Sequence, residues 1–154
     1  AFWADAAHSQ GFKDIFSFEL QNLADLALNS NNCFYEIYNS ETGAVDGGWQ
    51  LDHQWNSVHD QTWSATGYIR MIFNNLFGMR FTPEGLTFNP DVELLNEYGV
   101  EKLSNLRYLN GRLNIVISGK GTKLAAVKVN GKTQSVKKPI APADGITQIE
   151  LIIK

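Results

Sequence analysis

Apolar residues recur at steps of three and four positions in two segments of the first half of the chain. In residues 12–29 the stripe consists of Phe12, Ile15, Phe16, Leu20, Leu23, Leu26 and Ala27. In residues 60–77 it consists of Ala65, Ile69, Ile72, Phe73 and Leu76. This spacing places each set on one face of a helix. Asp60 is expected to cap the second helix, and Gly78 is expected to end it in the left-handed conformation.

Beyond Gly78 the apolar residues alternate with polar ones, which is the period of a β-strand. Asn110-Gly111 and Asn130-Gly131 are strong signals for tight turns between paired strands. The alternating segments are residues 80–82, 86–88, 102–109, 112–118, 124–129, 132–136 and 147–153. Six or seven short antiparallel strands are therefore predicted, arranged as a β-sandwich or a curved sheet.

The two patterns divide the 154-residue chain into two predicted parts, which give an α+β fold class. Residues 1–78 are predicted to be helical, with a long loop at residues 31–59. Residues 79–154 are predicted to form the antiparallel β domain. Most aromatic residues lie in the helical part, and two helices joined by a long loop cannot bury such faces alone. We therefore expect further helices to cover them, and the chain to be the C-terminal piece of a longer protein.

Composition and charge exclude several classes of partner. Hydrophobic residues make up 44% of the chain and the formal net charge is −3, so neither disorder nor a nucleic-acid partner is expected. No apolar run reaches the roughly 18 residues that span a bilayer, so no membrane partner is expected. The single cysteine, Cys33, excludes an internal disulfide and is expected to be a small buried thiol.

The long loop carries the candidate chemistry. Glu36 lies between Tyr35 and Tyr38, and Trp49 follows in the same loop. A carboxylate among aromatic rings suits a glycosidase, which needs acidic groups at the scissile bond and ring faces for the sugar. An isolated loop glutamate is, however, usually a solvated surface charge. Glu41 and Asp46 are lesser candidates for the same role because they share the loop.

Other residues have structural interpretations. Trp63 is expected to be a core residue more often than a site residue, and Arg70 is expected to be a structural ion-pair partner. His53 and His59 flank Trp55 without further ligands at a metal-site spacing, so no metal and no cofactor are predicted.

Four segments resemble glycoside hydrolase family 63 and the related glycogen-debranching-like proteins. The first, Phe2-Trp3-Ala4-Asp5, resembles the end of an earlier inner-helix segment. Phe34-Tyr35-Glu36-Ile37-Tyr38-Asn39-Ser40-Glu41-Thr42-Gly43 resembles the segment that carries their general base. Gln61-Thr62-Trp63-Ser64-Ala65-Thr66-Gly67-Tyr68 resembles the start of their last toroid helix. Leu76-Phe77-Gly78-Met79-Arg80-Phe81 with Pro83-Glu84-Gly85-Leu86 resembles the passage into their C-terminal β domain. The order of these segments is more specific than any one of them.

The resemblance implies the terminal helices of an (α/α)6 toroid followed by a small β domain, and the activity of an inverting α-glycosidase. On this reading Glu36 is the general base, and Trp49, Tyr38 and Tyr35 bind substrate. The general acid would lie upstream, outside this chain, so the isolated chain is expected to be inactive. The implied partners are an oligosaccharide substrate and the upstream part of the same enzyme, with a dimer expected through exposed helical faces. The location stays open, with a periplasmic or secreted bacterial protein favoured.

Two other functions remain open at this stage. One is a non-catalytic carbohydrate-binding or structural module that uses the β domain, although the β half is poor in aromatic residues. The other is a sugar phosphorylase of the related toroid families. A carboxylate at position 36 favours hydrolysis over phosphorolysis, because it would repel phosphate.

Overall fold

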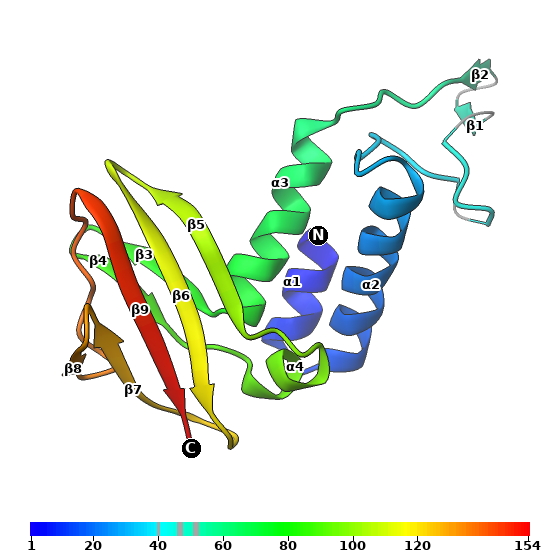
Figure 1. Ribbon diagram of the computed structural model, residues 1–154. Helices are drawn as coiled ribbons and strands as arrows, with labels where there is room; N and C mark the ends of the chain where they lie inside the picture. The colour runs from blue at the N-terminus through cyan, green and yellow to red at the C-terminus, as the bar shows by residue number, and fades with distance from the viewer. Residues whose placement is uncertain (40, 46–47, 51–52) are drawn as a thin grey trace. The chain divides into compact units, whose positions relative to one another are not determined.

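The computed structural model describes residues 1–39, 41–45, 48–50 and 53–154, and it shows an α+β protein (Figure 1). The chain divides into two compact units, residues 1–72 and residues 73–154. The sequence predicted this change of structure at Gly78, a few residues further on. In the described parts of the chain, no helix combines the length and the apolar character that a membrane span requires.

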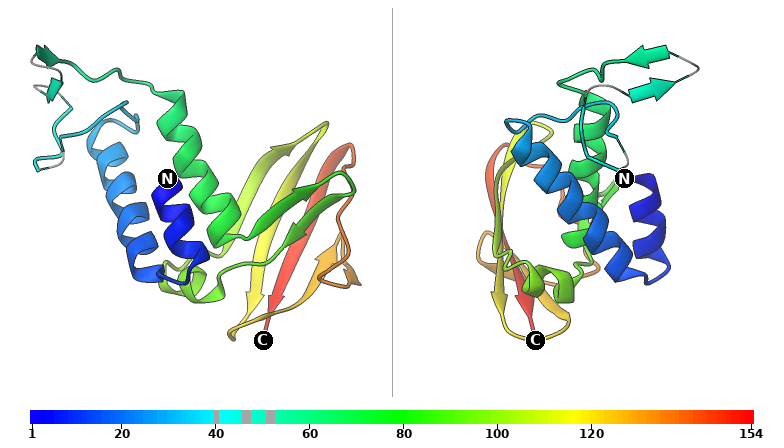
Figure 2. Two further views of the ribbon diagram at one scale, coloured as in Figure 1. Left: turned by 180° about the vertical axis from the view of Figure 1, so that it is seen from behind. Right: turned by 90° about the vertical axis from the view of Figure 1, so that its right-hand side faces the viewer.

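The described residues of the first unit, here called the helical unit, contain three α-helices: α1 (Phe2–Ser9), α2 (Lys13–Asn29) and α3 (Thr62–Arg70). Helices α1 and α2 form a tight hairpin, which Figures 1 and 2 both show. The buried apolar residues of this hairpin are Ala4, Ala7, Phe16, Leu20 and Ala27. The α2 stripe predicted from the sequence is therefore confirmed at its centre.

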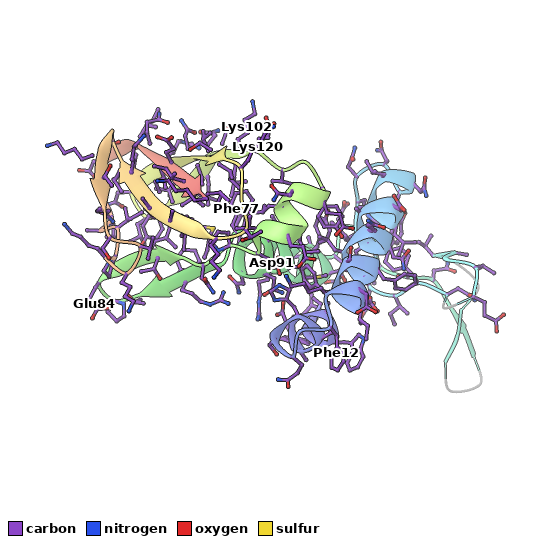
Figure 3. All side chains as sticks on the ribbon, turned by 90° about the horizontal axis from the view of Figure 1, so that it is seen from below. Phe12, Phe77, Glu84, Asp91, Lys102 and Lys120 are labelled. Carbon is purple, nitrogen blue, oxygen red and sulfur yellow. The ribbon has the colours of Figure 1, made fainter. Side chains whose placement is uncertain are left out.

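Phe12 departs from that stripe. It precedes α2 as the N-cap residue, and its side chain is exposed at the turn between the two helices (Figure 3). The backbone at Gly11 turns through a positive φ of 84°, which ends α1 and directs the chain into α2. Phe12 therefore lies outside the face of α2 that packs against α1.

Helix α3 begins later than predicted. Its N-cap is Gln61, whose side chain accepts a 3.4 Å hydrogen bond from the Trp63 backbone N–H. Asp60 was predicted to be the cap, but it lies outside the helix with a φ of 53° and uses its carboxylate elsewhere. After Arg70 the helix widens into a π-helical segment, η1 (Met71–Leu76), and Ile69 on the predicted buried stripe is exposed.

The second unit, here called the β unit, begins with a hairpin and a short helix. Strands β3 (Met79–Thr82) and β4 (Gly85–Phe88) pair antiparallel, as the sequence predicted. Figure 3 places Glu84 at the tip of this hairpin. Helix α4 (Val92–Glu97) follows, although no helix was predicted here. Asp91 caps it by accepting a 3.2 Å hydrogen bond from the Leu94 N–H.

Five further strands form one sheet in the order β5-β6-β9-β7-β8. Their bounds are β5 (Lys102–Tyr108), β6 (Gly111–Gly119), β7 (Leu124–Val129), β8 (Lys132–Gln134) and β9 (Gly145–Ile153). The last strand inserts between the two hairpins and runs parallel to β6, from Gly111↔Gly145 to Gly119↔Ile153. The prediction of a purely antiparallel domain was therefore wrong, because the sheet is mixed.

The alternation read from the sequence locates the core of the β unit. Ile149, Leu151 and Ile153 of β9 are buried, together with Leu113 and Ile115 of β6. The β3–β4 hairpin lies over one face of the sheet (Figure 2), and Leu86 pairs with Ile140 in an isolated bridge. The buried face of the sheet is thus covered within the unit.

A charged cluster lies on the other face of the sheet. The Glu150 carboxylate accepts hydrogen bonds from Lys128 Nζ at 2.9 Å and from Ser118 Oγ at 2.7 Å. These bonds, the one from Lys128 first, lower the pKa of Glu150 below its ordinary value of 4.5. A carboxyl whose pKa is lower in the folded state adds stability that is present above 4.5 and is lost as the pH falls through the folded value.

We therefore expect Glu150→Gln to flatten the acid side of the stability curve. The glutamine keeps the shape of the side chain but cannot titrate, so the variant should lose less stability than the parent protein as the pH falls below 4.5. Urea unfolding between pH 3 and pH 7 measures this. Parallel curves for the two proteins would contradict the assignment.

Candidate functional site

A pocket of about 690 Å³ opens in the helical unit. Its wall contains residues from α1, α2, the loop after α2 and α3. Glu36 lines it, together with Asp5 of α1 and Arg70 of α3. The volume falls within the roughly 300–1,000 Å³ that is typical of small-molecule sites. The sequence singled out Glu36 as the candidate catalytic residue, and the structure places it on this pocket.

Aromatic rings form one side of the pocket. Phe2 and Trp63 meet in a T-shaped arrangement, with ring centroids 6.5 Å apart and planes at 61°. Trp63 was expected to be a core residue, but its side chain is 75% exposed. The expectation was wrong, because the first turn of α3 lines the pocket and leaves the Trp63 ring open there.

An ion pair joins α1 to α3 beside these rings. Arg70 Nη2 lies 3.0 Å from Asp5 Oδ2, and the guanidinium carbon lies 5.3 Å from the centroid of the Phe2 ring. The expectation that Arg70 forms an ion pair is confirmed. Gly67 permits the close approach of the two helices, because a Cβ there would lie 2.8 Å from the Cβ of Ala1.

Backbone pairing at the base of the loop holds Glu36 in place. The Glu36 N–H donates to the Val58 carbonyl at 2.9 Å, and the Gln61 N–H donates to the Phe34 carbonyl at 2.8 Å. Next to the Glu36–Val58 bond, the Ile37 N–H donates to the buried Ser57 hydroxyl at 2.9 Å. The segment around Glu36 is therefore tied to the segment that leads into α3, and the Glu36 side chain stays exposed.

Residues 39–43, the second half of the segment that resembles the glycosidase motif, form a turn. Asn39 Oδ1 accepts hydrogen bonds from the backbone N–H groups of Glu41 and Thr42, both at 2.9 Å. The Gly43 N–H donates to the Asn39 carbonyl at 2.9 Å, and Gly43 has a φ of 70°. Glu41 is exposed and is not among the described residues that line the pocket. Asp46, the other rival to Glu36, lies outside the described residues.

The aromatic residues predicted to bind substrate lie elsewhere. The Tyr35 N–H donates to the Tyr38 hydroxyl at 2.9 Å, and their ring centroids are 6.2 Å apart. Tyr35 also contacts His59 at a centroid distance of 6.2 Å. The structure does not bring these tyrosines to the wall of the pocket described above. Trp49 belongs to β1 (Gly48–Gln50), which pairs with β2 (His53–Trp55), and its side chain lies outside the described part of the chain.

Hydrogen bonds between Cys33 and Asp60 join the two ends of the loop. Cys33 Sγ donates to Asp60 Oδ1 at 3.2 Å and accepts from the Asp60 N–H at 3.0 Å, while His59 Nδ1 lies 2.9 Å from Asp60 Oδ2. The bonds from Cys33 and then His59 lower the pKa of Asp60. The Asp60 N–H lowers the pKa of the Cys33 thiol, but burial and the Asp60 carboxylate outweigh it, and the net shift is upward. Cys33 is half-buried, less than expected.

Sequence reasoning missed Phe2, Asp5 and Trp63 as members of the site. One signal was available, because Trp63, Gly67 and Arg70 recur at steps of four and three and therefore share one face of α3. No signal linked that face to α1. Among the described residues, no group of three or more His, Cys, Asp and Glu side chains could hold a metal ion.

No family model matches the chain, and no curated protein matches it significantly.

Proposed function

We propose that this chain carries the general-base part of the active site of an inverting α-glycosidase that hydrolyses α-linked oligosaccharides. The observation that supports this most is the position of Glu36, which lies on a pocket of about 690 Å³ that has an aromatic wall. A carboxylate beside exposed rings combines the acid–base group and the stacking surface that sugar cleavage needs.

In this reaction Glu36 accepts a proton from a water molecule that attacks the anomeric carbon. A second carboxyl group, on the opposite side of the sugar and roughly 6.5–9.5 Å away, protonates the departing oxygen. Asp5 is the other acidic residue among the pocket's described lining. Its carboxylate is already held by a 3.0 Å hydrogen bond from Arg70, so it is not free to contact a departing oxygen. We therefore assign the general acid to a part of the enzyme upstream of this chain.

The proposed architecture is the end of an (α/α)6 toroid, with α1, α2 and α3 as its terminal helices. Exposed aromatic residues on the helical unit support this: Phe2, Trp3, Phe12, Phe18 and Trp63. Monomeric proteins rarely leave extensive apolar surface in water. Further helices of the toroid would cover the rings that lie outside the pocket.

Two observations favour hydrolysis at the helical unit over the other functions considered. The titratable side chains of the pocket, Asp5, Glu36 and Arg70, carry a formal net charge of −1, which disfavours phosphate as the attacking group. In the β unit, the aromatic residues after Phe88 are Tyr98 and Tyr108 alone, so this part of the chain offers fewer rings for stacking than the helical unit does. The sugar site is therefore assigned to the helical unit.

The experiment that tests this proposal is the Glu36→Gln substitution in the full-length protein, assayed on α-linked oligosaccharides. A large loss of turnover with an unchanged fold is expected. Turnover equal to that of the parent protein would remove Glu36 from the catalytic role.

A further inference from the structure

Two aromatic side chains of the helical unit are exposed at the same pocket. Trp63 is 75% exposed and Phe2 is 66% exposed. Aromatic rings bury a large apolar area when they pack in a core, so a ring pair left open beside a pocket is unusual. The pair is well placed to contact a ligand because both rings line the pocket that contains Glu36.

The Phe2 ring is held in place before any ligand binds. The centroids of the Phe2 and Trp63 rings lie 6.5 Å apart in an edge contact, and the Arg70 guanidinium carbon lies 5.3 Å from the Phe2 centroid. Arg70 is in turn fixed by its 3.0 Å ion pair with Asp5. A preorganised surface of this kind loses less conformational entropy on binding than a mobile one does.

The polar groups of the pocket define the chemistry of the ligand. Thr62, Ser64 and Thr66 alternate along the first turns of α3 and line the same pocket, and Glu36 adds a carboxylate. A ligand that matches has an apolar face for the rings and several hydroxyl groups at its edge. A pyranose ring has both features. The net negative charge of the pocket favours a neutral sugar over a uronic acid or a sugar phosphate.

We propose that Trp63 and Phe2 form the platform on which a neutral pyranose ring of the substrate stacks, beside Glu36. This inference rests on the proposed function, because it assigns the substrate contact of the same pocket. It also replaces the tyrosines of the loop, Tyr35 and Tyr38, as the principal stacking residues.

The test is calorimetric titration of the full-length protein with thio-linked maltotriose and with a thio-linked α-mannobiose, which resist hydrolysis. Trp63→Ala is expected to raise the dissociation constant of the sugar that binds by about fivefold or more, because the largest ring of the platform is lost. Trp63→Phe keeps an aromatic face and is expected to retain most of the affinity.

Trp3→Ala is the matched control. Trp3 is 63% exposed and adjoins Phe2 in sequence, but it is not among the described residues that line the pocket. Its substitution is expected to leave the dissociation constant unchanged. The proposal is overturned if neither sugar binds, if Trp63→Ala binds like the parent protein, or if Trp3→Ala weakens binding as much as Trp63→Ala does.

The titration and the Glu36→Gln assay separate the two proposals. If Glu36→Gln retains full turnover while Trp63→Ala loses affinity, the base assignment fails and the stacking platform stands. If Glu36→Gln abolishes turnover while Trp63→Ala binds normally, the platform fails and the base assignment stands. Far-ultraviolet circular dichroism of each variant shows whether the helices are intact.

Discussion

Glu36→Gln is expected to lower the kcat of the full-length protein on α-linked oligosaccharides by roughly 10²–10⁴-fold, the range that a positioned general acid or base contributes. Glutamine has the same shape as glutamate but cannot accept a proton from the attacking water. The Glu36 backbone N–H still donates to the Val58 carbonyl in the variant, so the loop should keep its structure. Initial rates at saturating substrate measure the change.

Glu41→Gln is the matched control for this prediction. Glu41 lies in the same loop and is exposed, but its described contact is a backbone hydrogen bond to Asn39 in the turn. The glutamine variant keeps that bond, and its kcat should stay close to that of the parent protein. A loss of activity at Glu41 with none at Glu36 would transfer the base assignment to the rival residue.

Gly78→Ala is expected to destabilise the β unit by roughly 3 kcal/mol or more. Gly78 follows η1 and has a φ of 59°. This backbone conformation is costly for any residue that carries a Cβ atom. A Cβ at this position would also lie 1.8 Å from the carbonyl oxygen of Asn89. That oxygen cannot move freely, because the Asn89 N–H donates to the Gly78 carbonyl at 2.9 Å. Urea unfolding of the variant measures the loss.

Gly99→Ala separates the cost of the positive φ from the cost of the steric contact with Asn89. Gly99 follows α4 with a φ of 61°, but a Cβ there would meet no atom within 4 Å. Its substitution should cost only the conformational term, about 1–2 kcal/mol. Equal losses at Gly78 and Gly99 would show that the steric contact with Asn89 contributes nothing.

Local sequence signals predicted the elements of this fold better than their arrangement. The apolar stripe of α2 and the Asn130-Gly131 turn are encoded within a few residues, so both could be read directly. The first hairpin turns one residue earlier than predicted, at Leu109-Asn110, because Tyr108 pairs with Gly111. The parallel pairing of β9 with β6 joins residues that are distant in sequence, and alternation alone does not specify a strand's direction. Helix α4 was missed because it is short, although Asp91 is a typical N-cap residue.

For the candidate site too, features that depend on neighbouring residues could be predicted, and features that depend on tertiary packing could not. Glu36 was singled out from its aromatic neighbours, and the structure places it on a pocket. Trp63 was misassigned because its exposure depends on which helix covers it, and this is a property of tertiary packing. Phe2 and Asp5 could not be linked to Glu36 from the sequence, because only the folding of α1 beside α3 brings them together.

The most direct test of the account is chemical rescue of Glu36→Ala in the full-length protein. Removal of the Glu36 side chain leaves room for azide. If Glu36 is the base, azide is expected to attack the anomeric carbon in place of water, without losing a proton, while the leaving group departs. Proton magnetic resonance of the product from an α-linked substrate should show a β-glycosyl azide, formed only by the variant. An α-glycosyl azide, or no azide product at all, would contradict Glu36 as the base of an inverting enzyme.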